Sequence, residues 1–567
     1  MPSTSSHPSR RRPRLLVTLL AVVAFVLPLF ALPSAGAQID DANTLRVHQR
    51  NFPSLLDPHQ LGFVDDIAVV GLLYEGLTRL DSKMDVVPGA AESWEFSEDG
   101  LTLTFHLHEG LTYSDGSPLT AERFRDAALR TCAPLTAGLY QAILFNVAGC
   151  QAYVESLGPV GEGTPVATPV SDERFVEDFG VTAPDDRTLV VELLEPAPYF
   201  PAIASMQVFF PAKQELIEAG GEGWWLDPAY HVGNGPFVMD TVDEDQQITF
   251  RANDAYWAGR PALDGIEYRY IQDNAVALQA YQQGDVDIMW VDPSQIEAIN
   301  EDPTLAEQFV QFPGTSTLSL NFNLREAPFD DKRVREAFAY GFDRATWCAE
   351  VFNGGCLPTT EWIPQGVMGA VDDDTYAFDP EKARQALAAS SYGGPDGLPE
   401  ITYTYVSDDP AETTRAEWIA GQYRDILGVE VELEGLEFAT WVDRFTSPDN
   451  FPQLTGAGWV QDYPDAQNWL SIIWACEATN LAVNVGYCNE EFDALIAQAD
   501  AELDPAARTA LYAEAHRLLL ADVPAVMTHN EARQYLVHPG VGGYEPTGSD
   551  YTFPGERGSL LTLDIQR

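Results

Sequence analysis

The fold of this 567-residue chain is decided by one stretch, which reads Pro328-Phe329-Asp330-Asp331-Lys332-Arg333-Val334-Arg335-Glu336-Ala337-Phe338-Ala339-Tyr340-Gly341-Phe342-Asp343-Arg344. Asp330 or Asp331 can cap a helix that begins just after them, and the Asp331 carboxylate can reach Arg335 one turn further on. Four apolar residues then recur at helical spacing: Val334, Ala337, Phe338 and Phe342. By itself, the stretch predicts an amphipathic helix with one buried face.

On both sides of this stretch, helical and extended patterns alternate. About 530 residues remain after the predicted leader, more than one hydrophobic core accommodates, so we expect more than one domain. Helical periodicity occurs over residues 121–129, 334–342, 380–389, 415–426 and 505–520. Strand-like runs are 101–107, 188–193, 265–271 and 401–406. The alternation predicts mixed α/β lobes, and the segment 157–172, rich in Gly and Pro, predicts a surface excursion.

The N-terminus has the three parts of a secretory leader. Four arginines between positions 10 and 14 precede the apolar run 15–32, and Ala35-Gly36-Ala37 follows. We therefore predict a signal peptide over residues 1–37 and an exported protein, in the periplasm or otherwise outside the cytoplasmic membrane. A membrane anchor is the alternative, but Pro28 and the Ala-x-Ala ending favour cleavage. No cysteine lies near the cleavage site, so a lipid anchor is not expected.

The six cysteines fall into three close pairs. Six cysteines permit 15 connectivities, but in an exported chain short loops favour pairing each cysteine with its neighbour. A zinc site is the alternative, and the Cys-x-x-Cys spacing typical of zinc ribbons is absent from the sequence. The predicted disulfides are Cys132 with Cys150, Cys348 with Cys356, and Cys476 with Cys488.

The chain is strongly acidic. Its formal net charge is −54, and without the four leader arginines the charge is about −58. Lysine occurs only at positions 83, 213, 332 and 382. Such a surface repels nucleic acid and anionic lipid, so neither is expected as a partner.

Several further blocks stand in a fixed order around the opening stretch. They are Leu56-Asp57-Pro58, Tyr74-Glu75-Gly76-Leu77, Pro88-Gly89-Ala90-Ala91-Glu92-Ser93-Trp94, residues 103–121, Val232-Gly233-Asn234-Gly235-Pro236-Phe237, Tyr256-Trp257, Leu263-Asp264 and Gln283-Gly284-Asp285-Val286-Asp287-Ile288. The ordered set resembles the family 5 bacterial extracellular solute-binding proteins, the peptide-, dipeptide- and nickel-binding components of ABC importers. His108 stands where the family usually has a basic residue.

The resemblance implies an α/β protein with a two-lobed, periplasmic-binding-protein-like fold of type II (a venus flytrap). Lobe one would combine residues 38–85, 201–311 and 525–567, with an extra small domain inserted at 86–200, and lobe two would span 312–524. Two crossing strands would form the hinge on which the lobes close.

The resemblance also places the ligand beside residues 458–465. In peptide-binding members the matching Trp-x-x-Asp-Tyr lies in the cleft, which implies that Asp462 pairs with the α-ammonium of the ligand while Trp459 and Tyr463 shape the pocket. Residues expected to border the cleft opposite are Phe63 and Val64, within 62–64, and Asn530 and Glu531. The residues alone equally allow Asp462 to begin a turn before Pro464.

One position departs from the peptide-binding pattern. Some peptide binders carry an arginine where this chain has Gly456, so a ligand carboxylate would need another base or a bridging water. His106 and His108 could form a metal pair on a strand, but no third ligand is placed beside them by the sequence, and we predict no metal.

We therefore predict a monomeric solute-binding protein that captures short peptides by lobe closure and delivers them to the permease subunits of an ABC importer. An oligosaccharide or nickel-chelate ligand is the alternative within the family. An extracellular hydrolase or a chemosensory surface protein is disfavoured: the sequence has no Gly-x-Ser-x-Gly, His-Glu-x-x-His or Gly-x-Gly-x-x-Gly motif, so we expect neither an enzyme nor a cofactor.

Overall fold

The computed structural model describes residues 43–157, 178–478, 480–548 and 560–566. The predicted signal peptide and nearly all of the predicted excursion at 157–172 lie outside these residues. Within the described ranges, no helix combines the length and the apolar composition that a membrane span requires.

The sheet of the first lobe has three parallel strands at its centre. β1 (Thr44–Gln49) lies between β10 (Gly265–Tyr270) and β11 (Ile288–Trp290). β9 (Gln247–Ala252) and β8 (Phe237–Asp243) continue the sheet antiparallel beyond β10. β1 is buried at every position except Arg46, as expected for a parallel strand that is covered on both faces.

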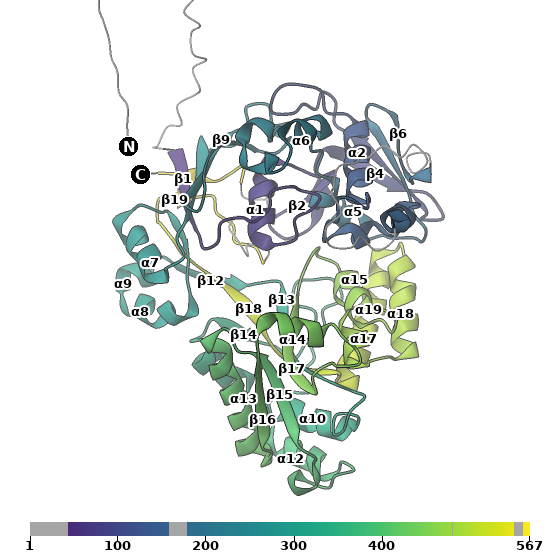
Figure 1. Cartoon of the computed structure of the whole chain (residues 1–567), viewed down its shortest axis with the longest axis vertical. Coiled ribbons are helices and arrows are strands. Elements are labelled where there is room, and N and C mark those ends of the chain that lie inside the picture. The colour runs from purple at the N-terminus through teal and green to yellow at the C-terminus, as the bar shows by residue number, and fades with distance from the viewer. Residues whose placement is uncertain (1–42, 158–177, 479, 549–559, 567) are drawn as a thin grey trace, which may run out of the picture. The chain divides into compact units, whose positions relative to one another are not determined.

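The sheet of the second lobe has the order β13 (Ser316–Phe322), β17 (Leu454–Val460), β15 (Ile401–Val406) and β16 (Val431–Leu436). One apolar core joins this sheet to helices α10 (Lys332–Tyr340), α12 (Pro380–Ala388) and α13 (Pro410–Leu427). A second core lies among the C-terminal helices of this lobe, where α18 and α19 run side by side (Figure 1). These helices are α15 (Ala466–Trp469), α16 (Ser471–Trp474), α17 (Leu481–Val485), α18 (Glu490–Ala501) and α19 (Pro505–Asp522).

One long strand, β18 (Ala525–Val537), belongs to both sheets. As far as Glu531 it pairs with β13 and with β14 (Cys356–Pro358), and from Ala532 it pairs with β12 (Phe309–Pro313) and β11. β12 and β13 follow each other in the chain, so the chain crosses between the sheets twice, in antiparallel directions (Figure 1). This is the arrangement that a hinge of two crossing strands requires. The predicted domain boundaries stay a prediction.

A small four-stranded sheet has its own apolar core. Its order is β4 (Ala91–Phe96), β5 (Thr102–Leu107), β7 (Thr188–Glu192) and β6 (Val181–Asp185), and α2 (Ala121–Thr131) packs on β6 and β7. The alternating burial of β5 and β7 is typical of antiparallel strands with one covered face. We call this sheet and its helices the small domain.

The cysteine pairing predicted from the sequence is confirmed. The disulfides are Cys132–Cys150, Cys348–Cys356 and Cys476–Cys488.

The other α-helices and strands of the described residues are α1 (Val64–Leu73), α3 (Cys150–Val154), α5 (Phe200–Ile203), α6 (Gln214–Gly220), α7 (Asn274–Gln283), α8 (Ile296–Glu301), α9 (Pro303–Ala306), α11 (Arg344–Thr346), α14 (Phe438–Phe445), β2 (Thr78–Leu80), β3 (Val86–Pro88), β19 (Val541–Gly542) and β20 (Asp564–Ile565).

The helix predicted from the opening stretch is α10. Asp331 caps it by accepting a hydrogen bond from the Arg333 N–H at 2.8 Å, and the predicted apolar stripe is completely buried. The charges of Asp331 and Arg335 attract each other as predicted, but the Asp331 oxygens accept their hydrogen bonds from the N–H groups of Arg333 and Ser391. The Arg335 guanidinium instead donates to the carbonyls of Asp522 and Val523, both at 2.9 Å. Carbonyls at the end of a helix lack intrahelical partners, so Arg335 ties α10 to the end of α19.

Arg344, the last residue of the stretch, joins three segments of the second lobe. Its buried guanidinium donates to the carbonyls of Thr359 (2.9 Å), Met527 (2.7 Å) and Tyr376 (2.9 Å). Burial lowers the pKa of Arg344 to about 10. The Met527 contact also ties this centre to β18.

Arg344→Leu should lower the free energy of unfolding by about 3–5 kcal/mol, because several buried carbonyls lose their donor at once. Arg333→Leu is the matched control, since this side chain is 61% exposed and forms a surface ion pair with Glu336; its effect should stay within about 0.5 kcal/mol. Urea unfolding followed by tryptophan fluorescence measures both, and equal effects would contradict the role given to Arg344.

Candidate functional site

The strand β17 leads directly to Asp462 and has one open edge. The N–H of Gln461 donates to the Thr315 carbonyl at 3.0 Å, which fixes the side of β17 that bonds to β13. Because bonding alternates along an antiparallel strand, the N–H and C=O groups of Gly458 and Val460 face the opposite side. Over the described part of the chain, β15 pairs with β17 on that side only as far as Thr455. Gly458 and Val460 are also exposed.

The Asp462 carboxylate is held by two neutral donors. The Tyr140 hydroxyl donates to Oδ1 and the Asn468 amide donates to Oδ2, each at 2.9 Å. Asn468 is completely buried, and its carbonyl oxygen accepts from the Asp462 N–H and from the Trp459 indole, each at 3.0 Å. Asn468 therefore fixes the relative positions of Asp462 and Trp459. Neither Tyr140 nor Asn468 was predicted from the sequence.

The bonded partners of Asp462 differ in charge from those of its neighbour Asp465. Both oxygens of Asp465 accept from the Arg508 guanidinium, at 2.6 and 2.7 Å, and both side chains are buried. In contrast, no ion pair formed by the described residues includes Asp462. Burial of the carboxyl group raises the pKa of Asp462, and the hydrogen bonds from Asn468 and Tyr140 only partly oppose this shift.

Tyr463 lies in the contact between the second lobe and the small domain. It is 1% exposed, belongs to the apolar core of the small domain, and stacks on Tyr199 with ring centroids 6.3 Å apart. Its hydroxyl donates to Gln467. Close by, the Gln461 amide approaches the sulfur of Met84 at 3.7 Å. Residues 461–463 therefore meet the small domain and the β2–β3 turn.

The other predicted ligand residues lie on two different elements. Phe63 stands immediately before α1, and Val64 is its first residue; the two side chains are 64% and 42% exposed. Asn530 and Glu531 lie where β18 passes from one sheet to the other. The Asn530 amide donates to the Ser316 carbonyl at 2.9 Å, so this side chain supports the crossing.

His106 and His108 each lie beside a glutamate of β4. His106 Nε2 is 3.5 Å from Glu95, His108 Nδ1 is 3.9 Å from Glu92, and the His108 ring also stacks on Trp257 at 4.3 Å. Among the described residues, the cluster with metal-like spacing is Cys476, Cys488 and Asp493, and its two cysteines are joined as a disulfide.

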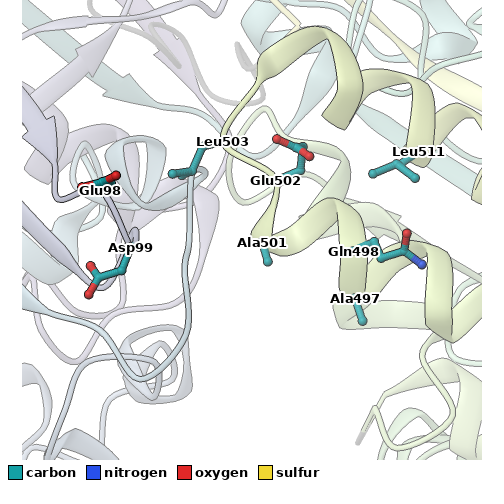
Figure 2. Close-up of a pocket in the computed structure, with 8 residues that line it drawn as sticks. All are labelled: Glu98, Asp99, Ala497, Gln498, Ala501, Glu502, Leu503 and Leu511. Atoms are coloured by element: carbon teal, nitrogen blue, oxygen red, sulfur yellow. The ribbon is translucent and has the colours of Figure 1, made fainter.

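Figure 2 shows an open hollow between the turn that carries Glu98 and Asp99 and the facing ends of α18 and α19. Its volume of about 670 Å³ is in the range of small-molecule sites. The lining residues include three carboxylates, from Glu98, Asp99 and Glu502, and neither a base nor an aromatic ring. Asp99 is already bonded to the Ser97 hydroxyl at 2.6 Å. None of the predicted ligand residues lines this hollow.

Comparison with known proteins gives a consistent result. The family model for bacterial extracellular solute-binding proteins, family 5 middle, matches residues 85–480. The chain is 30% identical to the probable deoxycholate-binding periplasmic protein YgiS of Escherichia coli K12, over 96% of this chain and 98% of that protein. It is 29% identical to the periplasmic oligopeptide-binding protein OppA of Salmonella typhimurium LT2, over 91% of this chain and 92% of the relative.

Solved structures resemble this fold over nearly the whole chain. The unliganded open form of MppA, a periplasmic murein tripeptide-binding protein, has a TM-score of 0.77 at 25% identity, covering 93% of this chain and 98% of the other. Haemophilus influenzae OppA in complex with the peptide RPPGFSPFR has a TM-score of 0.70 at 25% identity, covering 94% and 100%. The two-lobed fold predicted from the sequence is confirmed by these neighbours.

Removing the charge of Asp462 and removing that of Asp465 should have different effects on the free energy of unfolding. Asp465→Asn leaves the buried Arg508 without its partner and should lower the free energy of unfolding by about 3–5 kcal/mol. Asp462→Asn should leave stability at pH 7 equal or higher. The folded-state pKa of Asp462 is raised, so the wild type loses stability as pH rises through the interval between the unfolded and folded pKa values.

Urea unfolding without ligand, at pH 7 and again at about pH 2.5–3, below the ordinary pKa of an aspartate, tests this pair. Any gain from Asp462→Asn should shrink at the lower pH, where the wild-type carboxyl is protonated in both states. A large loss of stability in Asp462→Asn at pH 7 would assign Asp462 to the structure instead of the ligand.

Proposed function

This chain belongs to the bacterial extracellular solute-binding proteins of family 5, and from that premise we propose that it captures short peptides and delivers them to the permease of an ABC importer. The relatives named as oligopeptide- and murein peptide-binding proteins support the ligand class. Their periplasmic location, together with the predicted leader at 1–37 and three disulfides, supports export to an oxidising compartment. The proposed mechanism is binding and lobe closure, without a covalent step.

The observation that carries this proposal is the Asp462 carboxylate, whose bonded partners are neutral. An ionised carboxylate offers about four acceptor positions, and Tyr140 and Asn468 occupy two of them. An ammonium group with three N–H donors fits the positions that remain, and the charge-assisted bond would be strong where water is scarce. A peptide N-terminus supplies this group.

The open edge of β17 supports the same ligand. An extended peptide can hydrogen-bond to Gly458 and Val460 through its main chain, adding a strand to the sheet. Such bonds give affinity for any peptide backbone. Because this edge ends two residues before Asp462, a peptide on it could place its first residue beside the carboxylate.

Tyr140 connects ligand binding to lobe closure. Its hydroxyl belongs to the small domain, whereas Asp462 belongs to the second lobe. A ligand ammonium at Asp462 would lie beside both side chains and favour the arrangement that brings them together. The stacking of Tyr463 on Tyr199, which the structure already contains, would be kept in the closed form.

The alternative ligands fit this site less well. Deoxycholate, which the name of one relative mentions, carries a carboxylate that would be repelled by Asp462. An oligosaccharide would use the ring of Trp459 but would leave the carboxylate without a cation. The peptide proposal accounts for both the charge and the open strand edge.

Asp462→Asn should weaken binding of a free tripeptide such as Ala-Ala-Ala by about 2–5 kcal/mol, because the variant leaves a desolvated ammonium unpaired. The wild type should bind the N-acetylated tripeptide poorly for the same reason. Titration calorimetry measures both, with Asp443→Asn, at an exposed position of α14, as the matched control. Unchanged affinity in Asp462→Asn would remove the main chemical support for a peptide ligand.

Saturating tripeptide should also reduce the radius of gyration and raise the melting temperature, since a ligand that bridges the lobes stabilises the closed form. Small-angle scattering with and without peptide measures the first effect and calorimetry the second. The acetylated peptide is the control. If peptide binds and the radius of gyration does not change, closure is not part of capture.

A further inference from the structure

We propose that Leu139 and Phe63, with Val64, form a subsite for a bulky apolar side chain near the amino terminus of the ligand. The inference rests on the proposed function, because it takes the ligand ammonium to bind at Asp462. It goes further by naming the class of peptide: those with Leu, Ile, Phe or a similar residue at the first or second position. We call these three residues the apolar shelf.

The members of the apolar shelf are unusually exposed. Leu139 and Phe63, at 68% and 64%, are the two most exposed large hydrophobic side chains among the described residues, and Val64 is 42% exposed. Single exposed apolar residues are ordinary, whereas several of them grouped on one surface are a feature of interaction sites. Leu139 lies against the residue before Phe63, since a Cβ atom added to Gly62 would lie 2.3 Å from Leu139 Cδ1.

The loop that carries Leu139 is held in place at both ends. The Cys132–Cys150 disulfide closes it, and the Gln141 amide donates to the carbonyls of Thr131 and Ala133 at 2.8 and 2.7 Å. Gly138 packs against the His59 carbonyl so closely that a Cβ there would lie 2.0 Å from the oxygen. The loop therefore presents Leu139 outward as a fixed feature.

The apolar shelf is connected to the proposed ammonium site through the chain. Leu139 immediately precedes Tyr140, whose hydroxyl bonds to Asp462. A peptide whose ammonium reaches Asp462 can therefore direct a nearby side chain toward Leu139 and Phe63. Covering these side chains removes apolar surface from water on both partners, which favours a bulky apolar residue over a small or charged one. An acidic residue would in addition meet the negative field of the protein.

Titration calorimetry with matched tripeptides tests the apolar shelf. The wild type should bind Leu-Gly-Gly or Gly-Leu-Gly at least about tenfold more tightly than Ala-Gly-Gly and Gly-Ala-Gly. In Leu139→Ser and Phe63→Ser this preference should fall to about threefold or less. Leu194→Ser is the matched control, since Leu194 is also in the small domain and 59% exposed, and it should keep the full preference. Because all three side chains are exposed, the variants should fold normally.

The outcomes separate this inference from the proposed function. If Asp462→Asn weakens every peptide while Leu139→Ser keeps the wild-type preference, the apolar shelf is wrong and the ammonium site stands. A wild type that binds Leu- and Ala-containing peptides equally also overturns the apolar shelf. If none of the tripeptides binds to the wild type, the peptide assignment fails, and the apolar shelf fails with it.

Discussion

The structure depends on one continuous strand that is hydrogen-bonded to both sheets. Backbone bonds hold β18 to β13 and β14 on one side of Glu531 and to β12 and β11 on the other. The Gly314 N–H donates to the Glu531 carbonyl at 2.9 Å, and a Cβ on Gly314 would lie 2.8 Å from the Arg533 side chain. Gly314 thus has no room for a side chain where the two strands cross. A change in the angle between the sheets has to be absorbed by the backbone at this crossing.

The two sheets that this strand joins are why the proposed site is divided between segments distant in sequence. Asp462 and Asn468 belong to the second lobe, while Tyr140 and Leu139 belong to a disulfide-closed loop of the small domain. The contacts between the second lobe and the small domain include one hydrogen bond to Asp462, the stacking of Tyr463 on Tyr199, and the Arg508 guanidinium over the Tyr199 ring. These are side-chain contacts, whereas the ladders of β18 consist of backbone hydrogen bonds.

Local chemistry could be predicted from the sequence, and contacts between distant segments could not. Asp331 caps α10, the apolar stripe is buried, and the three disulfides join neighbouring cysteines, because each depends on residues close in sequence. The hydrogen-bond partners of Arg335 were missed because they lie 187 and 188 residues away and are created by the placement of α19. Tyr140 was missed for the same reason, since 322 residues separate it from Asp462. The choice of Asp462 as a ligand residue rests on the family resemblance and stays a prediction, because no local pattern distinguishes it from a turn residue.

The acidic composition and the proposed site both favour a positively charged ligand group. Acidic residues outnumber basic ones by 86 to 32 in the whole chain, and several of the bases are committed to interior contacts. Arg130 binds Asp57, Arg508 binds Asp465 and Lys213 binds Asp115, each at 2.6 Å, while Arg335 and Arg344 bind backbone carbonyls. Bases used in this way cannot compete for the Asp462 carboxylate. A cationic ligand would therefore be attracted by the field of the whole protein, and at the proposed site it would meet the Asp462 carboxylate, whose bonded partners carry no charge.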